Sequence, residues 1–263
     1  MLSFTNSNVQ QHNLRASNDE QNENNGLLTN IKLNPPYAIA YLSFLLLATY
    51  MSSVEPSGAS QTIIEKFISD PLHPENINEL FITEFNLLGL IGIPMSCLVM
   101  PGSKGQSLPA PPFLVGSSFA GYGALGIYMS TRQRPETLDN SNDTIGFVTR
   151  NILENKIFNW IVVGLALNTF VVTGVVSAFM NDGQSLWDGY LDTITSSALG
   201  FVSTVDLTIL CLTAASLIPE DLERRGVKDS GKAVAIAAST LLLPVVGTTL
   251  YCALRPSLNN TEE

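Results

Sequence analysis

Six apolar stretches alternate with polar segments along this chain, and each is about as long as a membrane-crossing helix. The stretches are Tyr37–Val54, Leu80–Pro101, Phe113–Thr131, Ile157–Asn181, Thr193–Pro219 and Ala233–Leu254. A helix needs roughly 20 apolar residues to cross the hydrocarbon core of a bilayer. The pattern therefore predicts an all-α fold, a multi-pass transmembrane helical bundle of six spans. Tyr37–Val54 is the shortest stretch, and if it lies in the interface instead, five spans are left.

Polar tails flank this predicted transmembrane domain, which covers residues 35–255. Residues 1–34 are rich in Asn, Gln and Ser, and such a composition buries too little apolar surface to fold. We expect a disordered tail there, although its acid-free start is also compatible with an organelle transit peptide. Residues 256–263 form a short acidic tail.

The polar connectors carry their own predictions. Gln61–Ser69 has the apolar spacing of a short amphipathic helix, and Gly226 should end a helix after the charged residues that precede it. The connectors Thr131–Lys156 and Glu220–Lys232 are basic, whereas the Asp182–Asp192 loop carries no base. The positive-inside rule then places both basic connectors on one side of the membrane, and six spans place both termini opposite them.

Composition excludes several classes of function. The net charge of −10 argues against a nucleic-acid partner, which needs a clustered basic face. The acids are expected in loops and tails, where they are hydrated. The two histidines, His12 and His73, lie outside the apolar stretches, so a membrane-buried haem between paired histidines is excluded. The cysteines fall inside apolar stretches without metal-ligand spacing, and we expect structural thiols and no metal site. They are Cys97, Cys211 and Cys252.

Glu84 and Asp206 are the two ionisable residues inside the apolar stretches, and they are the first candidates for function. A carboxyl group at membrane depth is costly, so it is neutral and hydrogen-bonded, lines an ion or proton path, or ligates a metal. Asp206 lies beside Ser203 and Thr204, which favours a neutral, hydrogen-bonded Asp between helices. Asn86 adds an amide at similar depth. Because chlorophyll magnesium accepts Glu or Asn oxygen, these residues are candidate contacts for chlorophyll or carotenoid, or for an ion.

The segment Gly121–Gly126 matches the G-x-G-x-x-G pattern of dinucleotide-binding loops. That reading requires a strand before the motif and a helix opening at it, whereas this motif lies inside an apolar stretch. We therefore interpret its small residues as one face of a membrane helix that lets a neighbouring helix or a flat pigment approach closely. The face comprises Gly116, Ser117, Ala120, Gly123, Ala124 and Ile127.

Several short motifs resemble a group of uncharacterised multi-pass integral membrane proteins of cyanobacteria and plastids. The motifs are Asp70-Pro71, Phe85–Gly89, Pro94, Leu108–Phe113 followed by a Gly-rich run to Arg132, and Val205–Thr208 with Asp221 after it. The resemblance covers roughly residues 70–254. It implies a plastid setting, in the thylakoid or the envelope, and it implies no particular activity.

The predicted function is that of a non-enzymatic integral protein of the plastid thylakoid. It would be an accessory or assembly subunit of a larger photosynthetic membrane complex, in contact with lipid and pigment. Another organelle membrane is the alternative location. The alternative function is a small ion or solute transporter or channel that uses Glu84 and Asp206 as polar stations.

Overall fold

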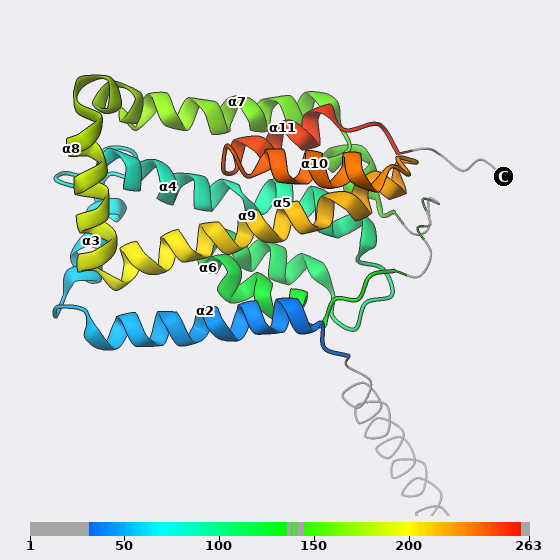
Figure 1. Ribbon diagram of the computed structural model, residues 1–263, viewed down its shortest axis with the longest axis horizontal. Coiled ribbons are helices and arrows are strands. Elements are labelled where there is room, and N and C mark those ends of the chain that lie inside the picture. The colour runs from blue at the N-terminus through cyan, green and yellow to red at the C-terminus, as the bar shows by residue number, and fades with distance from the viewer. Residues whose placement is uncertain (1–31, 136–137, 139, 141–144, 259–263) are drawn as a thin grey trace, which may run out of the picture.

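Helices form the regular structure of the part of the chain that a computed structural model describes, residues 32–135, 138, 140 and 145–258 (Figure 1). Residues 1–31 of the predicted tail 1–34 lie outside these residues. The ten α-helices of the described chain confirm the all-α class. They are α2 (Pro35–Val54), α3 (Ala59–Ser69), α4 (Glu79–Leu90), α5 (Gly92–Val99), α6 (Ala110–Thr131), α7 (Lys156–Val172), α8 (Val175–Ser196), α9 (Ala198–Arg224), α10 (Ser230–Thr240) and α11 (Val246–Leu254).

Four long elements run side by side along the long axis of the molecule: α2, the α4–α5 pair, α7 and α9 (Figure 1). Helices α3 and α8 lie across one end of them. Three segments of the described chain are long and apolar enough to cross a membrane, namely Pro35–Val54, Glu79–Gly102 and Ala198–Arg224. A fourth exists if α7 and α8, which are bent by 52° at their junction, count as one span. The predicted six spans are therefore wrong in number, because two of the apolar stretches fold back on themselves.

The first of these is α6, which turns back at Gly121. Gly121 has φ 52° and ψ −133°, a conformation that only glycine adopts readily. Residues on either side of the turn then pack together: the Phe113 and Tyr128 rings lie 6.1 Å apart, and a Cβ on Gly116 would lie 3.1 Å from that of Ala124. A straight helix would separate Phe113 and Tyr128 by roughly 22 Å. The predicted single face of small residues is therefore wrong, since its members lie on the two arms of a hairpin.

The second is the stretch Ala233–Leu254, which forms the α10–α11 hairpin. Helix α10 enters from the end at which the chain leaves α9, and α11 returns to the same end (Figure 1). The turn contains Pro244 and Val245, whose φ of 63° is unusual for a β-branched residue. The backbones pack closely at the turn, where a Cβ on Gly247 would overlap the Thr240 carbonyl. Each arm of about 10 residues is too short to cross a bilayer alone.

Helices α3 and α8, at one end of the molecule, confirm one prediction from the sequence and contradict another. The predicted amphipathic helix is confirmed as α3, with Ile63 and Phe67 buried. The predicted acidic loop Asp182–Asp192 is instead part of helix α8, which is kinked at Asp182. Its carboxylates lie on the exposed side, so acidity does not prevent a helix whose other side packs on α4 and α9.

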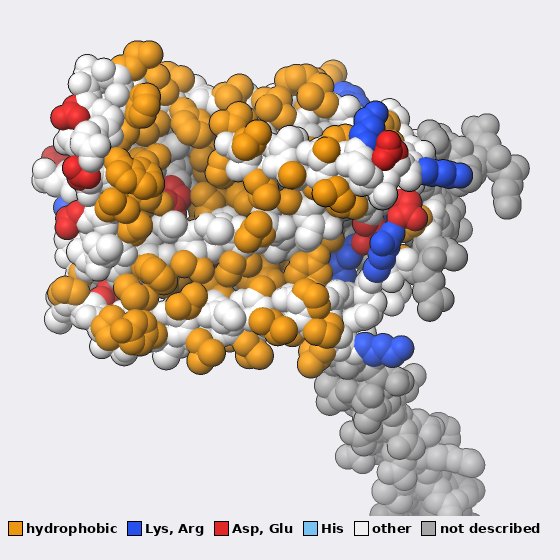
Figure 2. All heavy atoms as spheres, in the orientation of Figure 1, with side chains coloured by type: hydrophobic (Ala, Val, Ile, Leu, Met, Phe, Trp, Pro, Cys, Tyr) orange, Lys and Arg blue, Asp and Glu red, His pale blue; other side chains and the backbone are white. Residues whose placement is uncertain are grey.

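Charges divide the molecule into two ends, with an apolar band between them (Figure 2). The acidic end comprises α3, α8 and the connectors around them. The basic end comprises both ends of each hairpin, the start of α7 and the end of α9, and it holds every described Lys and Arg except Lys66. The described chain also begins and finishes at the basic end (Figure 1). For the ends of the described chain, the prediction of a position opposite the basic connectors is thus wrong, because the hairpins change the number of crossings.

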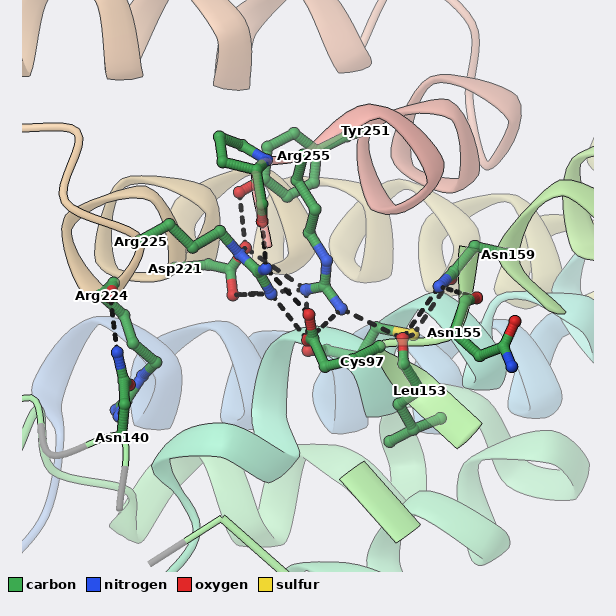
Figure 3. Close-up of polar contacts among 12 residues, drawn as sticks. Cys97, Asn140, Leu153, Asn155, Asn159, Asp221, Arg224, Arg225, Tyr251 and Arg255 are labelled. Carbon is green, nitrogen blue, oxygen red and sulfur yellow. Dashed lines mark hydrogen bonds and ion pairs between the residues drawn. The ribbon is translucent and has the colours of Figure 1, made fainter. Parts of the chain in front are cut away.

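A buried ion network closes the basic end (Figure 3). Arg225 pairs with Glu154 at 2.7 Å and Asp221 at 2.8 Å, and Arg255 pairs with the same two acids at 2.7 and 3.3 Å. The Tyr251 hydroxyl donates to Asp221 at 2.6 Å. Burial works against the charge on Arg225, but its pairing with Glu154 and Asp221 outweighs burial and raises its pKa. These acids join α9, α11 and the turn before α7, so the expectation that acids here serve hydration alone is wrong.

The predicted helix stop at Gly226 is confirmed. Gly226 has φ 82°, its N–H bonds to the Glu223 carbonyl, and the Val227 N–H bonds to the Leu222 carbonyl. This pair of bonds is the Schellman arrangement that ends many helices at a glycine. The stop places Arg225 at the end of α9, where it reaches both acids of the network.

Candidate functional site

A pocket of about 450 Å³ lies between α4, α8 and α9 and reaches the turn of the α10–α11 hairpin. Its wall is mainly apolar, and its few polar side chains gather on α4, α8 and α9. The lining residues are Leu80, Thr83, Glu84, Leu87, Phe170, Trp187, Tyr190, Thr204, Leu207, Thr208, Cys211, Leu212, Leu241 and Pro244. The pocket thus brings one sequence candidate, Glu84, to a ligand-sized space.

Helix α4 positions Glu84 inside the protein. The Asn78 side chain caps the helix by accepting from the N–H groups of Leu80 and Phe81, which fixes where the helix begins. Glu84 follows in the second turn and is only 8% exposed. Its Oε2 accepts a hydrogen bond of 2.5 Å from the Tyr190 hydroxyl, whereas its Oε1 has no hydrogen-bond partner. An unsatisfied buried carboxyl oxygen is unusual and requires an explanation.

The hydroxyl groups around Glu84 are already engaged. Thr204 donates to the Gly200 carbonyl and also contacts the Tyr190 hydroxyl at 3.1 Å. Thr208 donates to the Thr204 carbonyl. Thr83 bonds to the Glu79 carbonyl and to the Thr173 hydroxyl. Oε1 of Glu84 is therefore a buried polar atom at this pocket that lacks a hydrogen-bond partner.

Asp206 has a different position and a structural role. Its Oδ1 accepts a 2.6 Å hydrogen bond from the Tyr122 backbone N–H, the first residue after the turn of α6. The returning arm of α6 begins there, so the carboxyl group caps a helix N-terminus, where the helix dipole favours an acid. A Cβ on Gly121 would overlap the Asp206 carboxyl group. The expected buried, hydrogen-bonded Asp is found, but its partner is a backbone amide in another helix.

Asn86 does not join either carboxyl group. Its side-chain amide donates to the Pro71 carbonyl at 3.0 Å and to the Ile82 carbonyl at 2.9 Å, and so holds the connector after α3 against α4. Thr204 and Asp206 are two residues apart on α9, which places them about 200° apart around the helix. Glu84 lies on the Thr204 side. The three sequence candidates therefore occupy three separate places, and the two carboxyl groups do not face a common path.

Sequence reasoning missed Tyr190 and Trp187, which complete the pocket, because both lie in the segment predicted as an acidic loop. The signal was the helical spacing of the apolar residues in that segment. One helix face would hold Leu186, Trp187 and Tyr190, which are separated by one, three and four residues. The same helix carries Asp182, Asp188 and Asp192, which had suggested a loop.

The site can bind an amphiphile, because it offers an apolar wall together with a buried hydrogen-bonding group on Glu84. Within the described residues, His, Cys, Asp and Glu do not form groups of three that could hold a metal ion. Comparison with known proteins gives no match to a protein-family model, a curated protein or a solved structure.

Proposed function

We propose that this chain is a non-enzymatic integral membrane protein that holds an apolar ligand with a polar group in the Glu84 pocket. The observation that carries this proposal is Glu84, which lines an apolar pocket and whose buried Oε1 has no hydrogen-bond partner. A buried polar group costs free energy unless it is hydrogen-bonded, and a ligand would supply the missing bond.

The membrane setting is supported by the exposed apolar surface. Leu46, Phe119 and Met180, for example, are 72%, 89% and 81% exposed. Large apolar side chains of this kind cover the band between the two charged ends (Figure 2) and indicate contact with a lipid bilayer. The positive-inside rule then places the basic end in the cytosol or stroma. Cysteines introduced for Lys104 and Lys228 should react with an impermeant maleimide from one face, and a cysteine for Ser185 from the other.

Membership of a larger photosynthetic complex in the thylakoid, with chlorophyll or carotenoid as the ligand, is the finer form of the proposal. The sequence resemblance supports it. Helix α2 supports it too: Phe44 is the one buried residue of α2, so the rest of the helix offers an apolar surface on which a neighbouring subunit can pack. Mild native electrophoresis of plastid membranes tests this form: the protein should migrate with a large pigmented complex, and migration as a free monomer would contradict it.

The rival function, a transporter that uses both carboxyl groups, has less support. Asp206 is engaged at the turn of α6, and it lies on the opposite side of α9 from Glu84. A path through both groups would have to pass around a helix whose interior face is packed with residues such as Leu210 and Ala214.

Co-purification tests the pocket. Thr208→Trp should fill it, because Thr208 lines the pocket and is exposed on α9. Thr49→Trp is the matched control: Thr49 is also exposed on a helix, and its hydroxyl also bonds to the carbonyl four residues earlier. Mass spectrometry of solvent extracts should find an apolar ligand at near-stoichiometric amount in the wild type and in Thr49→Trp, and much less in Thr208→Trp. Equal amounts in all three, or no ligand in the wild type, would overturn the proposal.

A further inference from the structure

A second pocket, here called the α8 pocket, adjoins the Glu84 pocket. It has a volume of about 500 Å³ and lies where the end of α7 meets α8. Leu80, Phe170 and Trp187 line both pockets, so the two spaces meet at these three side chains. The remaining lining residues of the α8 pocket are Val175, Val176, Phe179, Met180, Gly183 and Leu186. A ligand longer than the Glu84 pocket therefore has adjacent space to occupy.

The two pockets differ in the side chains that line them. Five side chains with a hydroxyl or carboxyl group line the Glu84 pocket: Thr83, Glu84, Tyr190, Thr204 and Thr208. The side chains of the α8 pocket carry no polar atom except the indole N–H of Trp187. A buried polar group costs free energy where it finds no hydrogen bond. A ligand that occupies both pockets should thus have its polar end in the Glu84 pocket and hydrocarbon in the α8 pocket.

The α8 pocket borders the lipid-facing surface. Its wall includes Val176, Phe179 and Met180, whose side chains are themselves 47%, 68% and 81% exposed. A lipophile dissolved in the bilayer can therefore reach the pocket from the side, without crossing either charged end of the molecule.

Charge limits what the polar end of such a ligand can be. Among the described residues, Lys, Arg and His line neither pocket, whereas Glu84 lines one of them. A phosphate or carboxylate group bound here would be buried beside an acid without a cation to pair with. The pockets therefore select against lipids with an anionic head group.

We infer that the ligand is a tailed lipophile from the bilayer, with a polar end that is not an anion in the Glu84 pocket and a long hydrocarbon tail in the α8 pocket. This inference rests on the proposed ligand-binding function and specifies its ligand class. Long-chain alcohols and quinones with a hydrocarbon tail belong to the class. Fatty-acid anions, phospholipids and compact molecules without a tail do not.

Fluorescence of Trp187 offers a direct assay, because this side chain lines both pockets. The chain has two tryptophans, so Trp160→Phe leaves Trp187 as the sole one. This parent protein is delipidated in glyco-diosgenin, a detergent without an alkyl chain that could itself enter the α8 pocket. It is titrated with ethyl-benzoquinone and hexadecyl-benzoquinone, which share a quenching ring and differ in the tail. Dissociation constants are expressed as mole fractions in the micelle, so that partition of the tail into detergent is not counted as binding.

We expect saturable quenching by both quinones, with the hexadecyl compound bound about tenfold more tightly because its tail gains packing contacts in the α8 pocket. Val176→Phe narrows that pocket, so it should weaken the hexadecyl compound about tenfold and leave the ethyl compound within about twofold. Thr208→Phe narrows the Glu84 pocket and should weaken both. Val171→Phe is the matched control and should change neither, since Val171 is 70% exposed near the end of α7 and lines neither pocket.

Two competitors with the same tail test the polar end. Hexadecan-1-ol should displace hexadecyl-benzoquinone from the parent protein. Hexadecanoate at pH 9, where it is ionised, should compete at least tenfold less well, because its carboxylate would be buried without a cation.

Three results would overturn the inference: equal affinity of the two quinones for the parent protein, a Val176→Phe variant that binds both as the parent does or weakens both equally, or displacement by hexadecanoate as strong as by the alcohol. Failure of the ligand class and failure of the function are separable. Saturable binding of ethyl-benzoquinone that Thr208→Phe weakens, without any effect of the tail, contradicts the tailed ligand alone. Absence of saturable quenching by either quinone, together with no co-purifying ligand, contradicts both.

Discussion

Asp206 and Glu84 are both acids buried within apolar helices, at 5% and 8% exposure, yet their surroundings differ. Asp206 contacts the turn of the α6 hairpin, where it accepts the Tyr122 N–H and leaves no room for a side chain at residue 121. Glu84 lines a pocket and uses one oxygen for Tyr190, while its other oxygen has no hydrogen-bond partner. Burial among apolar helices therefore does not tell a structural acid from a candidate binding acid. The contacts of the carboxyl oxygens distinguish the two.

The largest effect is expected from Gly121→Ala, which disturbs the contact between Asp206 and the turn of α6. The alanine would have to adopt a positive φ, which side chains disfavour, and its Cβ would overlap the Asp206 carboxyl group. Backbone strain and overpacking together should cost on the order of 3 kcal/mol or more. We expect low yield in membranes and a clearly lower thermal unfolding midpoint in detergent.

Gly123→Ala is the control, because its Cβ would meet Phe44 at an ordinary 3.7 Å. If Gly121→Ala unfolds at the temperature of Gly123→Ala, the turn at residue 121 is not what holds α6 against α9.

Asp206→Leu should have an intermediate effect. It leaves the Tyr122 N–H buried without an acceptor, a loss of roughly 1–3 kcal/mol. Asp206→Asn keeps an acceptor oxygen at the same place and should remain within about 1 kcal/mol of the wild type. Chemical unfolding in detergent compares the two variants. A stable Asp206→Asn protein that loses an ion flux in liposomes would assign Asp206 to transport and would contradict its structural role.

Glu55 gives the smallest expected effect and shows an acid outside the apolar band. Hydrogen bonds from the Ser60 hydroxyl and the Ala198 N–H lower its pKa. An acid with a lowered pKa in the folded state stabilises the protein above its unfolded pKa, and this contribution is lost as the pH falls through the folded value. The thermal midpoint of the wild type should therefore exceed that of Glu55→Gln at pH 7, and the difference should shrink toward pH 3. A constant difference would show that these hydrogen bonds do not depend on the charge.

The sequence predicts where helices form better than whether an apolar stretch forms one straight helix or a hairpin. Apolar length locates α2, α4–α5, α7 and α9, because these elements contact lipid or core along their whole length. The same length is equally consistent with a hairpin of two short arms, so Gly121 and the turn at Pro244 could not be distinguished from a tolerated glycine and a kink. Contacts across the turn, such as the packing of Phe113 on Tyr128, identify the hairpin within α6.

The candidate site was predictable in part for a similar reason. Rarity of charge in the apolar stretches identifies Glu84 and Asp206, but their partners are distant in sequence. Tyr190 is 106 residues from Glu84, and Tyr122 is 84 residues from Asp206. The same holds for Arg255, whose partner Glu154 lies 101 residues away. Composition and spacing carry no information on such pairs.

Ligand retention by paired variants tests the central claim most directly. Asp206→Asn and Glu84→Leu, each purified in the same mild detergent, are compared with the wild type for the amount of apolar ligand extracted per protein. The account predicts full retention in Asp206→Asn and strong loss in Glu84→Leu, with both variants folded by circular dichroism. Equal loss in both variants, or retention in Glu84→Leu, would contradict the division of the two buried acids into a structural group and a binding group.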